Sequence, residues 1–313
     1  MNAIVVEKIK KSSGIKKKPV VALSDISFEV KTGELFGFIG ADGAGKTTLF
    51  RILTTLLIPD SGKVSIGGMD VVDDFKKIRK IIGYMPGKFS LYQDLTVEEN
   101  IQFFATIFNT TLTENYHLVK DIYSHLENFK DRKAGALSGG MKQKLALCCA
   151  LIHKPKILFL DEPTTGVDAV SRKEFWELLK SLQEKNITIV VSTPYMDEAT
   201  LCDRVALIHQ GLILQINEPQ VITQNFGKPL WAFQSDNMYK LRLDLLSLNE
   251  VESCYPFGQY HHVTLNNPDN ILEVESKIKS KNHELRYEKI PASIEDCFLS
   301  LMSERKIETP IPV

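Results

Sequence analysis

The sequence lacks any long apolar run, and its first residues do not place a charged segment ahead of an apolar stretch. A membrane-spanning helix needs about 18 or more consecutive apolar residues, and a secretory leader needs a charged start before its apolar core. Neither class of segment is therefore predicted. We expect a protein of the cytosol, so that any contact with a membrane comes through a partner.

The sequence also lacks an excess of charge of either sign. Its 38 lysines and arginines are balanced by 39 aspartates and glutamates, which gives a formal net charge of −1. A nucleic-acid-binding protein usually carries a clustered basic excess, so no nucleic-acid partner is expected. The five cysteines show no metal-ligand spacing. We expect them to be reduced residues of the core.

The composition that remains is that of an ordinary globular protein, with 43% apolar and 25% charged residues over 313 positions. Between residues 4 and 214, short β-branched runs alternate with helical stretches, which predicts an α/β fold with a largely parallel sheet. Strands are expected at residues 36–39, 81–85, 157–160, 187–191 and 205–208. A helix is expected over residues 47–57, because the proline and turn cluster at residues 58–62 cannot continue it.

Two other stretches bear on the organisation of the chain. The lysine-rich residues 8–18 are interpreted as a solvated hairpin loop, with a patch for an anionic membrane as the alternative. After Pro219 the pattern becomes β-α-β-β-α-β, which predicts a small split βαβ domain. Its expected strands are residues 229–234, 250–255, 260–265 and 284–288, and its expected helices are residues 237–246, 269–280 and 293–303. We therefore expect two domains, at residues 1–217 and 218–313.

Residues 40–47 match the phosphate-loop pattern G-x-x-x-x-G-K-[ST], between a predicted strand and a predicted helix. A phosphate chain needs several backbone N–H donors, so glycines stand where a Cβ would block the approach or where φ is positive. The helix N-terminus adds a partial positive charge. Lys46 is predicted to contact the β and γ phosphates, and the Thr47 hydroxyl to coordinate Mg²⁺. The predicted nucleotide-binding residues are Gly40, Ala41, Asp42, Gly43, Ala44, Gly45, Lys46, Thr47 and Thr48.

Two carboxylates, Asp161 and Glu162, end the apolar strand that starts near Ile157. Ligands of α/β sheets bind at the carboxyl ends of the strands, so this strand delivers both acids beside the phosphate loop. Asp161 is predicted to hold Mg²⁺, directly or through water. Glu162 is predicted to be the general base that orients and deprotonates the attacking water. The alternative, two solvated acids in a turn, is disfavoured by the phosphate loop upstream.

Residues 137–145, just upstream of that strand, read LSGGMKQKL. This segment resembles the signature motif of the ATP-binding cassette (ABC) family, which other phosphate-loop ATPases do not carry. The motif opens a helix, so a hydroxyl and N–H groups point at an anion. In the family, that anion is the γ-phosphate held by the opposite subunit of a head-to-tail dimer. The residues predicted for this contact are Ser138, Gly139 and Gly140.

The resemblance covers about residues 4–215, and residues 292–298 are similar to the tail of ATPases of drug and antibiotic exporters. It implies a P-loop NTPase fold of ABC type, with a RecA-like mixed sheet, a helical subdomain at about residues 90–150 and a small α+β C-terminal domain. By resemblance, residues 163–168 are the D-loop, in which Asp168 communicates across the dimer. The implied cofactors are ATP and Mg²⁺. The implied partners are a membrane permease and a second ATP-binding subunit, at the inner face of the cell membrane.

Three family features are missing. Family members usually carry glutamine after the strand that ends near Met85, where this sequence has Gly87, and the γ-phosphate-sensing histidine of the switch loop is replaced by Pro194. No aromatic residue occurs in residues 1–27 to stack on adenine, although stacking is worth about 1–3 kcal/mol per base in nucleic-acid systems. Loss of one preorganised group at a developing charge typically lowers a rate on the order of a hundred- to thousandfold.

These features favour an ATP-binding and ATP-hydrolysing subunit that energises an ABC exporter, of drugs or other amphipathic compounds, by nucleotide-driven dimerisation. The alternative is a degenerate ATP-binding regulatory partner whose signature motif completes the active site of a second ATPase subunit. Retained Lys46, Asp161 and Glu162 count against that alternative, while Gly87 and Pro194 count for it. ABC proteins of translation or chromosome maintenance would carry two cassettes or a long coiled-coil insertion, and this sequence has one uninterrupted cassette.

Overall fold

A computed structural model describes residues 1–14, 20–281 and 284–308, which form two compact units that meet between Pro219 and Gln220. The strands of the first unit are β1 (Asn2–Ser13), β2 (Val20–Lys31), β3 (Leu35–Ile39), β4 (Ser61–Ile66), β5 (Met69–Asp70), β6 (Ile82–Met85), β7 (Ile157–Asp161), β8 (Thr188–Thr193), β9 (Arg204–His209) and β10 (Leu212–Asn217). Its helices are α1 (Lys46–Leu53), α2 (Phe75–Ile81), α3 (Val97–Ile107), α4 (Leu112–Tyr123), α5 (Gly139–Leu151) and α6 (Ala169–Glu184), with short 3-10 helices η1 (Glu127–Phe129), η2 (Ala134–Ala136) and η3 (Met196–Leu201).

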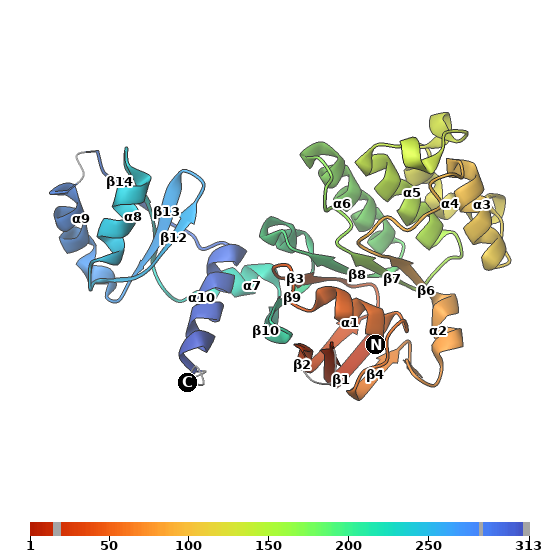
Figure 1. The fold of residues 1–313 in the computed structure, drawn as a ribbon, viewed down its shortest axis with the longest axis horizontal. Coiled ribbons are helices and arrows are strands. Elements are labelled where there is room, and N and C mark those ends of the chain that lie inside the picture. The colour runs from red at the N-terminus through yellow and green to blue at the C-terminus, as the bar shows by residue number, and fades with distance from the viewer. Residues whose placement is uncertain (15–19, 282–283, 309–313) are drawn as a thin grey trace. The chain divides into compact units, whose positions relative to one another are not determined.

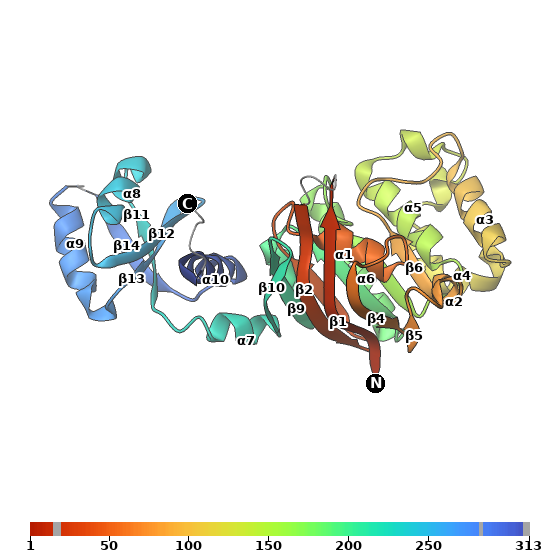
Figure 2. The same ribbon diagram turned by 60° about the horizontal axis from the view of Figure 1, so that its bottom comes forward.

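A six-stranded sheet forms the centre of the first unit, in the order β10-β9-β3-β8-β7-β6 (Figures 1 and 2). Strands β9, β3, β8, β7 and β6 are parallel, and β10 is an antiparallel edge strand. Every residue of β3, β7 and β8 is buried, as expected of parallel strands covered on both faces. The mixed α/β sheet predicted from the sequence is confirmed.

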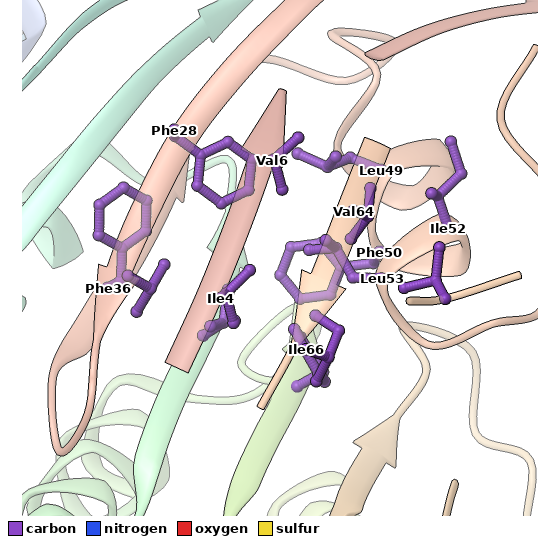
Figure 3. Packing of buried hydrophobic residues seen from close by; sticks show 14 of the residues in the cluster. Ile4, Val6, Phe28, Phe36, Leu49, Phe50, Ile52, Leu53, Val64 and Ile66 are labelled. Carbon is purple, nitrogen blue, oxygen red and sulfur yellow. The ribbon is translucent and has the colours of Figure 1, made fainter. Parts of the chain in front are cut away.

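A second, antiparallel sheet in the order β2-β1-β4-β5 lies against α1. Alternate residues of its strands point into one apolar cluster, which Figure 3 shows from close by. The labelled members of this cluster are Ile4, Val6, Phe28, Phe36, Leu49, Phe50, Ile52, Leu53, Val64 and Ile66. Because α1 supplies Leu49, Phe50, Ile52 and Leu53, the helix that follows the phosphate loop is fixed by its apolar face.

The ring of Phe50 also connects α1 to the central sheet. Its centroid lies 6.0 Å from that of Phe38 on β3 and 6.1 Å from that of Phe159 on β7, both in edge-to-face geometry. Such aromatic pairs add about 0.5–1.5 kcal/mol each beyond the burial of apolar area. The helix is therefore held between the two sheets, which fixes the phosphate loop relative to the end of β7.

Helices α3, α4 and α5 pack together beside the central sheet and form a helical group within residues 97–151 (Figure 1). Thr96 and Thr111 each begin a helix with a capping box. The threonine hydroxyl accepts the backbone N–H of Glu99 or Glu114, and the carboxylate of that glutamate accepts the backbone N–H of the threonine. These caps satisfy N–H groups that the first helical turn leaves free. Helical structure thus occupies the region where the family resemblance implies a helical subdomain.

Two local predictions are wrong. The helix predicted over residues 47–57 ends at Leu53, because Thr55 adopts a φ of +62° and the chain turns back, with the N–H of Leu56 bonded to the carbonyl of Arg51. The loop predicted for residues 8–18 is a strand as far as Ser13, because β1 pairs with β2 on one side and β4 on the other. The rest of that prediction, residues 15–19, lies outside the described residues.

The second unit contains a four-stranded antiparallel sheet in the order β12-β13-β11-β14. Its elements are β11 (Leu230–Gln234), α8 (Met238–Leu246), β12 (Val251–Phe257), β13 (Tyr260–Leu265), η4 (Pro268–Asn270), α9 (Ile271–Lys279), β14 (Arg286–Ile290) and α10 (Ile294–Glu308), and α7 (Pro219–Gln224) crosses the boundary. The β-α-β-β-α-β order predicted from the sequence is confirmed. Helices α8 and α9 cover one sheet face around Phe233, Val263 and Val274.

The five cysteines are all free and buried, as predicted. Burial raises the pKa of the Cys254 thiol to about 11, so little of it is thiolate at neutral pH. Within the part of the chain that the structure describes, no helix is long and apolar enough to cross a membrane.

Candidate nucleotide-binding site

The loop between β3 and α1 has a backbone that tolerates only glycine at two positions. Gly45 has a φ of +105°, and a Cβ there would lie 2.5 Å from the carbonyl oxygen of Ala22. A Cβ on Gly40 would lie 2.1 Å from the carbonyl oxygen of Ile208. These distances are far below van der Waals contact, so the two glycines let the loop pack directly on neighbouring backbone.

A hollow of about 250 Å³ lies over this loop. Its lining combines the loop, the first turn of α1, the start of β2 and one carboxylate. The lining residues are Val20, Val21, Ala22, Gly43, Ala44, Gly45, Lys46, Thr47, Thr48 and Glu162. The N-terminal end of α1 opens here, and helix N-termini favour anions because their first N–H groups are unpaired. The hollow therefore suits a phosphate group.

Lys46 is buried at the base of the hollow, with 3% of its surface exposed. Its Nζ donates to the carbonyl oxygens of Gly40 at 2.7 Å and Ala41 at 3.1 Å, and lies 3.2 Å from Glu162 Oε1. A buried ammonium is costly unless it has partners of this kind. The structure thus brings the lysine predicted to bind phosphate within ion-pair distance of the predicted general base.

Asp161 ends β7 and is 2% exposed. Its Oδ1 accepts the hydroxyl of Ser192 at 2.6 Å, and the next residue, Glu162, donates its N–H to the carbonyl oxygen of Ser192 at 3.0 Å. Among the described residues, no cluster of three or more His, Cys, Asp or Glu side chains could hold a metal by itself. The carboxylate of Asp161 is a donor that fits Mg²⁺, which usually takes one or two protein oxygens and completes its shell with phosphate and water.

The signature residues lie at the start of α5 and not in the described lining of the hollow. Ser138 caps α5, and its Oγ accepts the N–H of Met141 at 3.3 Å. A Cβ on Gly139 would lie 3.4 Å from the carbonyl oxygen of Gly166, and one on Gly140 would lie 2.8 Å from Ser171 Oγ. The signature helix therefore starts against the predicted D-loop, and it contributes nothing to the described lining of the hollow.

Asp168 at the end of the predicted D-loop caps α6. Its Oδ1 accepts the N–H groups of Ser171 at 2.9 Å and Val170 at 3.1 Å. These hydrogen bonds, the one from Ser171 foremost, hold the pKa of Asp168 below its usual range. The aspartate is therefore ionised at neutral pH and fixes the direction in which the loop enters α6.

The two altered positions both lie beside the carboxylates or the loop. A Cβ on Gly87 would lie 3.0 Å from the carbonyl oxygen of Asp161. Pro194 directly follows β8, whose last residue, Thr193, accepts the N–H of Gly40 through its carbonyl oxygen at 3.3 Å. Side chains at both positions would therefore stand at the edge of the sheet where the phosphate loop and Glu162 meet.

A model of the ABC transporter family matches residues 23–165. The Nod factor export ATP-binding protein I of Burkholderia pseudomallei is 34% identical over 292 residues, which covers 92% of this chain and 94% of that protein. This chain belongs to the ABC transporter ATP-binding family. The predicted P-loop NTPase fold of ABC type and the predicted family are both confirmed.

Other similar proteins match part of this chain, over different shares of their own length. The probable multidrug ABC transporter ATP-binding protein YbhF of Escherichia coli is 42% identical over 201 residues, but the match spans only 35% of that protein. The solved structure of cbiO1 from Clostridium perfringens has a TM-score of 0.63 at 27% identity and covers 72% of this chain and 91% of its own. A dimeric, post-hydrolysis cassette, MJ0796 bound to ADP and Pi, has a TM-score of 0.63 at 26% identity over 69% of this chain and 98% of its own.

Reasoning from the sequence missed the residues that flank the hollow on the side of β2. Val20 and Val21 are 65% and 58% exposed and line the hollow beside the phosphate loop. Their exposure on a strand offers an apolar surface where the sequence has no aromatic residue to stack on a base. The next residue of β2, Ala22, packs against Gly45 of the loop, and this contact places the two valines there. Their one sequence signal is two adjacent valines at the start of a strand.

We expect the double change Val20→Ser and Val21→Ser to weaken Mg-ATP binding about three- to tenfold. The base would lose apolar contact, and apolar area removed from water is worth about 25 cal/mol per Å². Isothermal titration calorimetry with Mg-ATP measures the effect. Val72→Ser, a change of an exposed valine that does not line the hollow, is the control. Equal affinity in the two variants would show that the valines do not touch the nucleotide.

Proposed function

We propose that this cassette binds Mg-ATP in the hollow, hydrolyses it in a head-to-tail dimer and thereby energises a membrane exporter. The observation that carries the proposal is the convergence of Lys46, Asp161 and Glu162 at one edge of the central sheet. Lys46 Nζ and Glu162 Oε1 are 3.2 Å apart, and Asp161 precedes Glu162 in the chain. This is the set of charges that phosphoryl transfer to water requires.

Each residue has a part in the proposed mechanism. The phosphate-loop N–H groups and Lys46 would bind the β and γ phosphates, while Thr47 and Asp161 would hold Mg²⁺. The metal supplies positive charge to the phosphate oxygens. Glu162 would orient the attacking water and accept its proton at a carboxylate oxygen. Ser192 fixes both acids, because its hydroxyl donates to Asp161 and its carbonyl oxygen accepts the N–H of Glu162.

The proposed partner in hydrolysis is a second ATP-binding subunit. Ser138 and Gly139 are exposed at the start of α5, so their hydroxyl and N–H groups are open to a phosphate that another subunit holds. The solved cassette MJ0796, similar in fold, is dimeric with ADP and Pi bound. Asp168 and the rest of the D-loop lie beside the signature residues and would therefore belong to the same interface.

The proposed site for a permease is an apolar groove of about 310 Å³ between the helical group and β6. It is lined by residues that include Tyr84, Met85, Leu91, Phe104, Phe108 and His153. Burial and the negative charge of Asp161 raise the pKa of Tyr84 to about 12. Tyr84 lines the groove, and its strand β6 pairs with β7, the strand that ends at Asp161, so β6 would connect the proposed permease site to the proposed metal site.

The proposed substrates are drugs or other amphipathic compounds, and the proposed location is the inner face of the cell membrane. Support comes from the names of similar proteins, one a probable multidrug transporter subunit and the other a Nod factor exporter subunit. Substrate choice would lie in the permease, because the described residues of the hollow suit a nucleotide and no transported compound.

A second candidate is a partner whose own site turns over slowly while its signature helix serves a better-equipped subunit. Gly87 and Pro194 favour it, since both stand at the edge where γ-phosphate contacts are expected and neither carries a side chain that could make one. The intact Ser138 cap of α5 also fits this candidate. The two candidates share ATP binding and differ in turnover.

The first test of the proposal is Lys46→Ala. Hydrogen bonds to charged groups are worth about 1.5–3 kcal/mol, so the dissociation constant for Mg-ATP should rise about ten- to 150-fold. Calorimetry or a fluorescent ATP analogue measures it. Lys63→Ala removes an exposed lysine of β4 outside the hollow and should leave the constant unchanged. Failure of the parent chain to bind Mg-ATP would end the proposal.

A further inference from the structure

Glu198 is a buried carboxylate outside the phosphate hollow, with 2% of its surface exposed. It lies in η3, four residues beyond Pro194. Both of its oxygens accept threonine hydroxyls: Oε1 accepts that of Thr164 at 2.8 Å, and Oε2 accepts that of Thr193. Oε1 also lies 3.9 Å from Arg172 Nε. One carboxylate therefore connects three separate segments of the chain.

Two of these contacts enclose the D-loop. Thr164 stands two residues after Glu162, at the start of the loop, and Arg172 is in the first turn of α6, just after the Asp168 cap. Both meet the same oxygen, Oε1, so the two ends of the loop are fixed at one point.

The third contact reaches the switch position. Thr193 ends β8 directly before Pro194, and its Oγ1 accepts the N–H of Tyr195 at 3.0 Å while donating to Glu198. The guanidinium of Arg172 lies 4.6 Å from the centre of the Tyr195 ring. The residues on both sides of Pro194 are therefore connected, through Glu198 and Arg172, to the two ends of the D-loop.

A charge buried this completely lowers stability unless its partners compensate, and well-packed apolar residues often serve a core equally well. Its hydrogen bonds link the segment that follows the general base to the segment that follows the switch strand. We propose that Glu198 is a positioning residue, which fixes the D-loop against the switch position and so connects the phosphate site of this chain to the surface that meets a second ATP-binding subunit. This inference rests on the proposed ATPase function.

The test is Glu198→Gln, which keeps the size of the side chain and removes its charge. Coupling between two sites of a protein typically changes an equilibrium by about five- to 150-fold. We expect the loss of this contact to lower kcat about tenfold. The dissociation constant for Mg-ATP should stay within about twofold, since Glu198 touches no residue that lines the hollow. A residue that served stability alone would not separate kcat from binding in this way.

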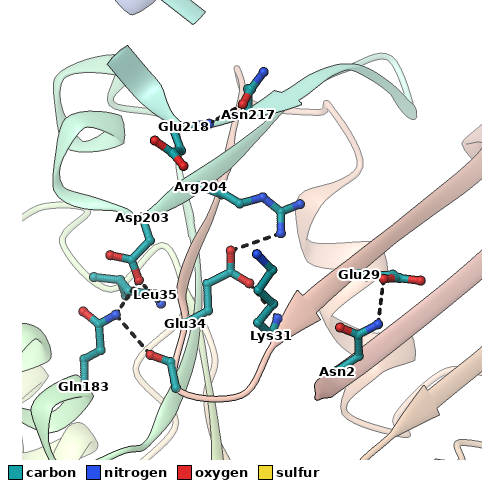
Figure 4. A network of polar contacts seen from close by, with 11 residues as sticks. Asn2, Glu29, Lys31, Glu34, Leu35, Gln183, Asp203, Arg204, Asn217 and Glu218 are labelled. Carbon is teal, nitrogen blue, oxygen red and sulfur yellow. Dashed lines mark hydrogen bonds and ion pairs between the residues drawn. The ribbon is translucent and has the colours of Figure 1, made fainter. Parts of the chain in front are cut away.

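Glu34→Gln is the matched control. Glu34 is also buried, at 6% exposure, accepts the N–H of Lys31 at 2.6 Å and lies 3.2 Å from Arg204 Nη1 (Figure 4). It precedes β3, at the opposite end of that strand from the phosphate loop. We expect Glu34→Gln and Glu198→Gln both to lower the melting temperature, and Glu34→Gln to leave kcat unchanged. Thr164→Val should reproduce the loss of kcat and add little to it in the double variant.

A second measurement is amide hydrogen exchange of the nucleotide-free protein. It does not depend on ATP hydrolysis, so it tests the role of Glu198 independently of the proposed function. Exchange in residues 163–168 and 193–196 should become faster in Glu198→Gln and stay as in the parent in Glu34→Gln. Parental exchange and parental kcat in Glu198→Gln would overturn the positioning role. Absence of ATP hydrolysis in the parent would contradict the proposed function instead, while exchange would still decide whether Glu198 holds the two segments.

Discussion

Replacing Glu162 by glutamine should lower ATP hydrolysis on the order of a hundred- to ten-thousandfold, because that is what a well-placed general base contributes. Glu162 is the one carboxylate in the described lining of the hollow, and its Oε1 lies 3.2 Å from Lys46 Nζ. A glutamine keeps the shape of the side chain and cannot accept the proton of the attacking water. Steady-state phosphate release, measured with saturating Mg-ATP, checks the prediction.

Nucleotide binding should respond differently from hydrolysis in this variant. Loss of the negative charge of Glu162 leaves the Lys46 ammonium without its only carboxylate within 4 Å among the described residues, so Mg-ATP should bind at least as tightly as in the parent. Glu177→Gln, at an exposed carboxylate of α6, is the control and should change neither quantity. Hydrolysis at the parental rate in Glu162→Gln would remove Glu162 from the mechanism.

Replacing Pro194 by histidine should raise hydrolysis on the order of ten- to a hundredfold if the site lacks a γ-phosphate contact. Proline offers no donor, and position 194 follows Thr193, whose carbonyl oxygen bonds the first N–H of the phosphate loop. One preorganised donor at a developing charge is worth about a hundred- to thousandfold, and an introduced donor recovers part of that. The same phosphate-release assay measures the gain.

Pro194→Ala separates the two consequences of that change. Alanine removes the constraint of the proline ring and adds no side-chain donor, so its rate should stay near that of the parent. A gain in histidine alone would support the slow-site candidate and call for a search for the partner ATPase. Brisk hydrolysis in the parent, unchanged by histidine, would instead mean a self-sufficient homodimer in which Pro194 is tolerated variation.

The phosphate loop could be recognised from the sequence because its determinants are local. The spacing of the motif alone places Lys46 and Thr47 at the start of a helix and marks Gly40 and Gly45 as glycines. The close contacts of these two glycines with distant backbone are visible only in the structure. The order of strands and helices followed from periodicity for the same reason. Both depend on residues that are close in the chain.

The errors and omissions arose where distant segments meet or where one residue adopts an unusual backbone conformation. Residues 8–13 form a strand because β2 and β4 flank them, and a lysine-rich composition does not reveal such partners. The helix stops at Leu53 because Thr55 adopts a positive φ, which few non-glycine residues do. Val20 and Val21 become part of the hollow only after β2 folds beside the loop.

The family resemblance, the α/β order of elements and the residues of the phosphate loop can be recognised in the sequence, because they depend on short motifs and local periodicity. Which of those residues meet depends on the packing of distant segments. Lys46 and Glu162 are 116 positions apart in the sequence and 3.2 Å apart in space, and Glu198 bonds Thr164 across 34 positions. Such contacts follow from the parallel pairing of β3, β7 and β8, which brings the carboxyl ends of distant strands to one edge.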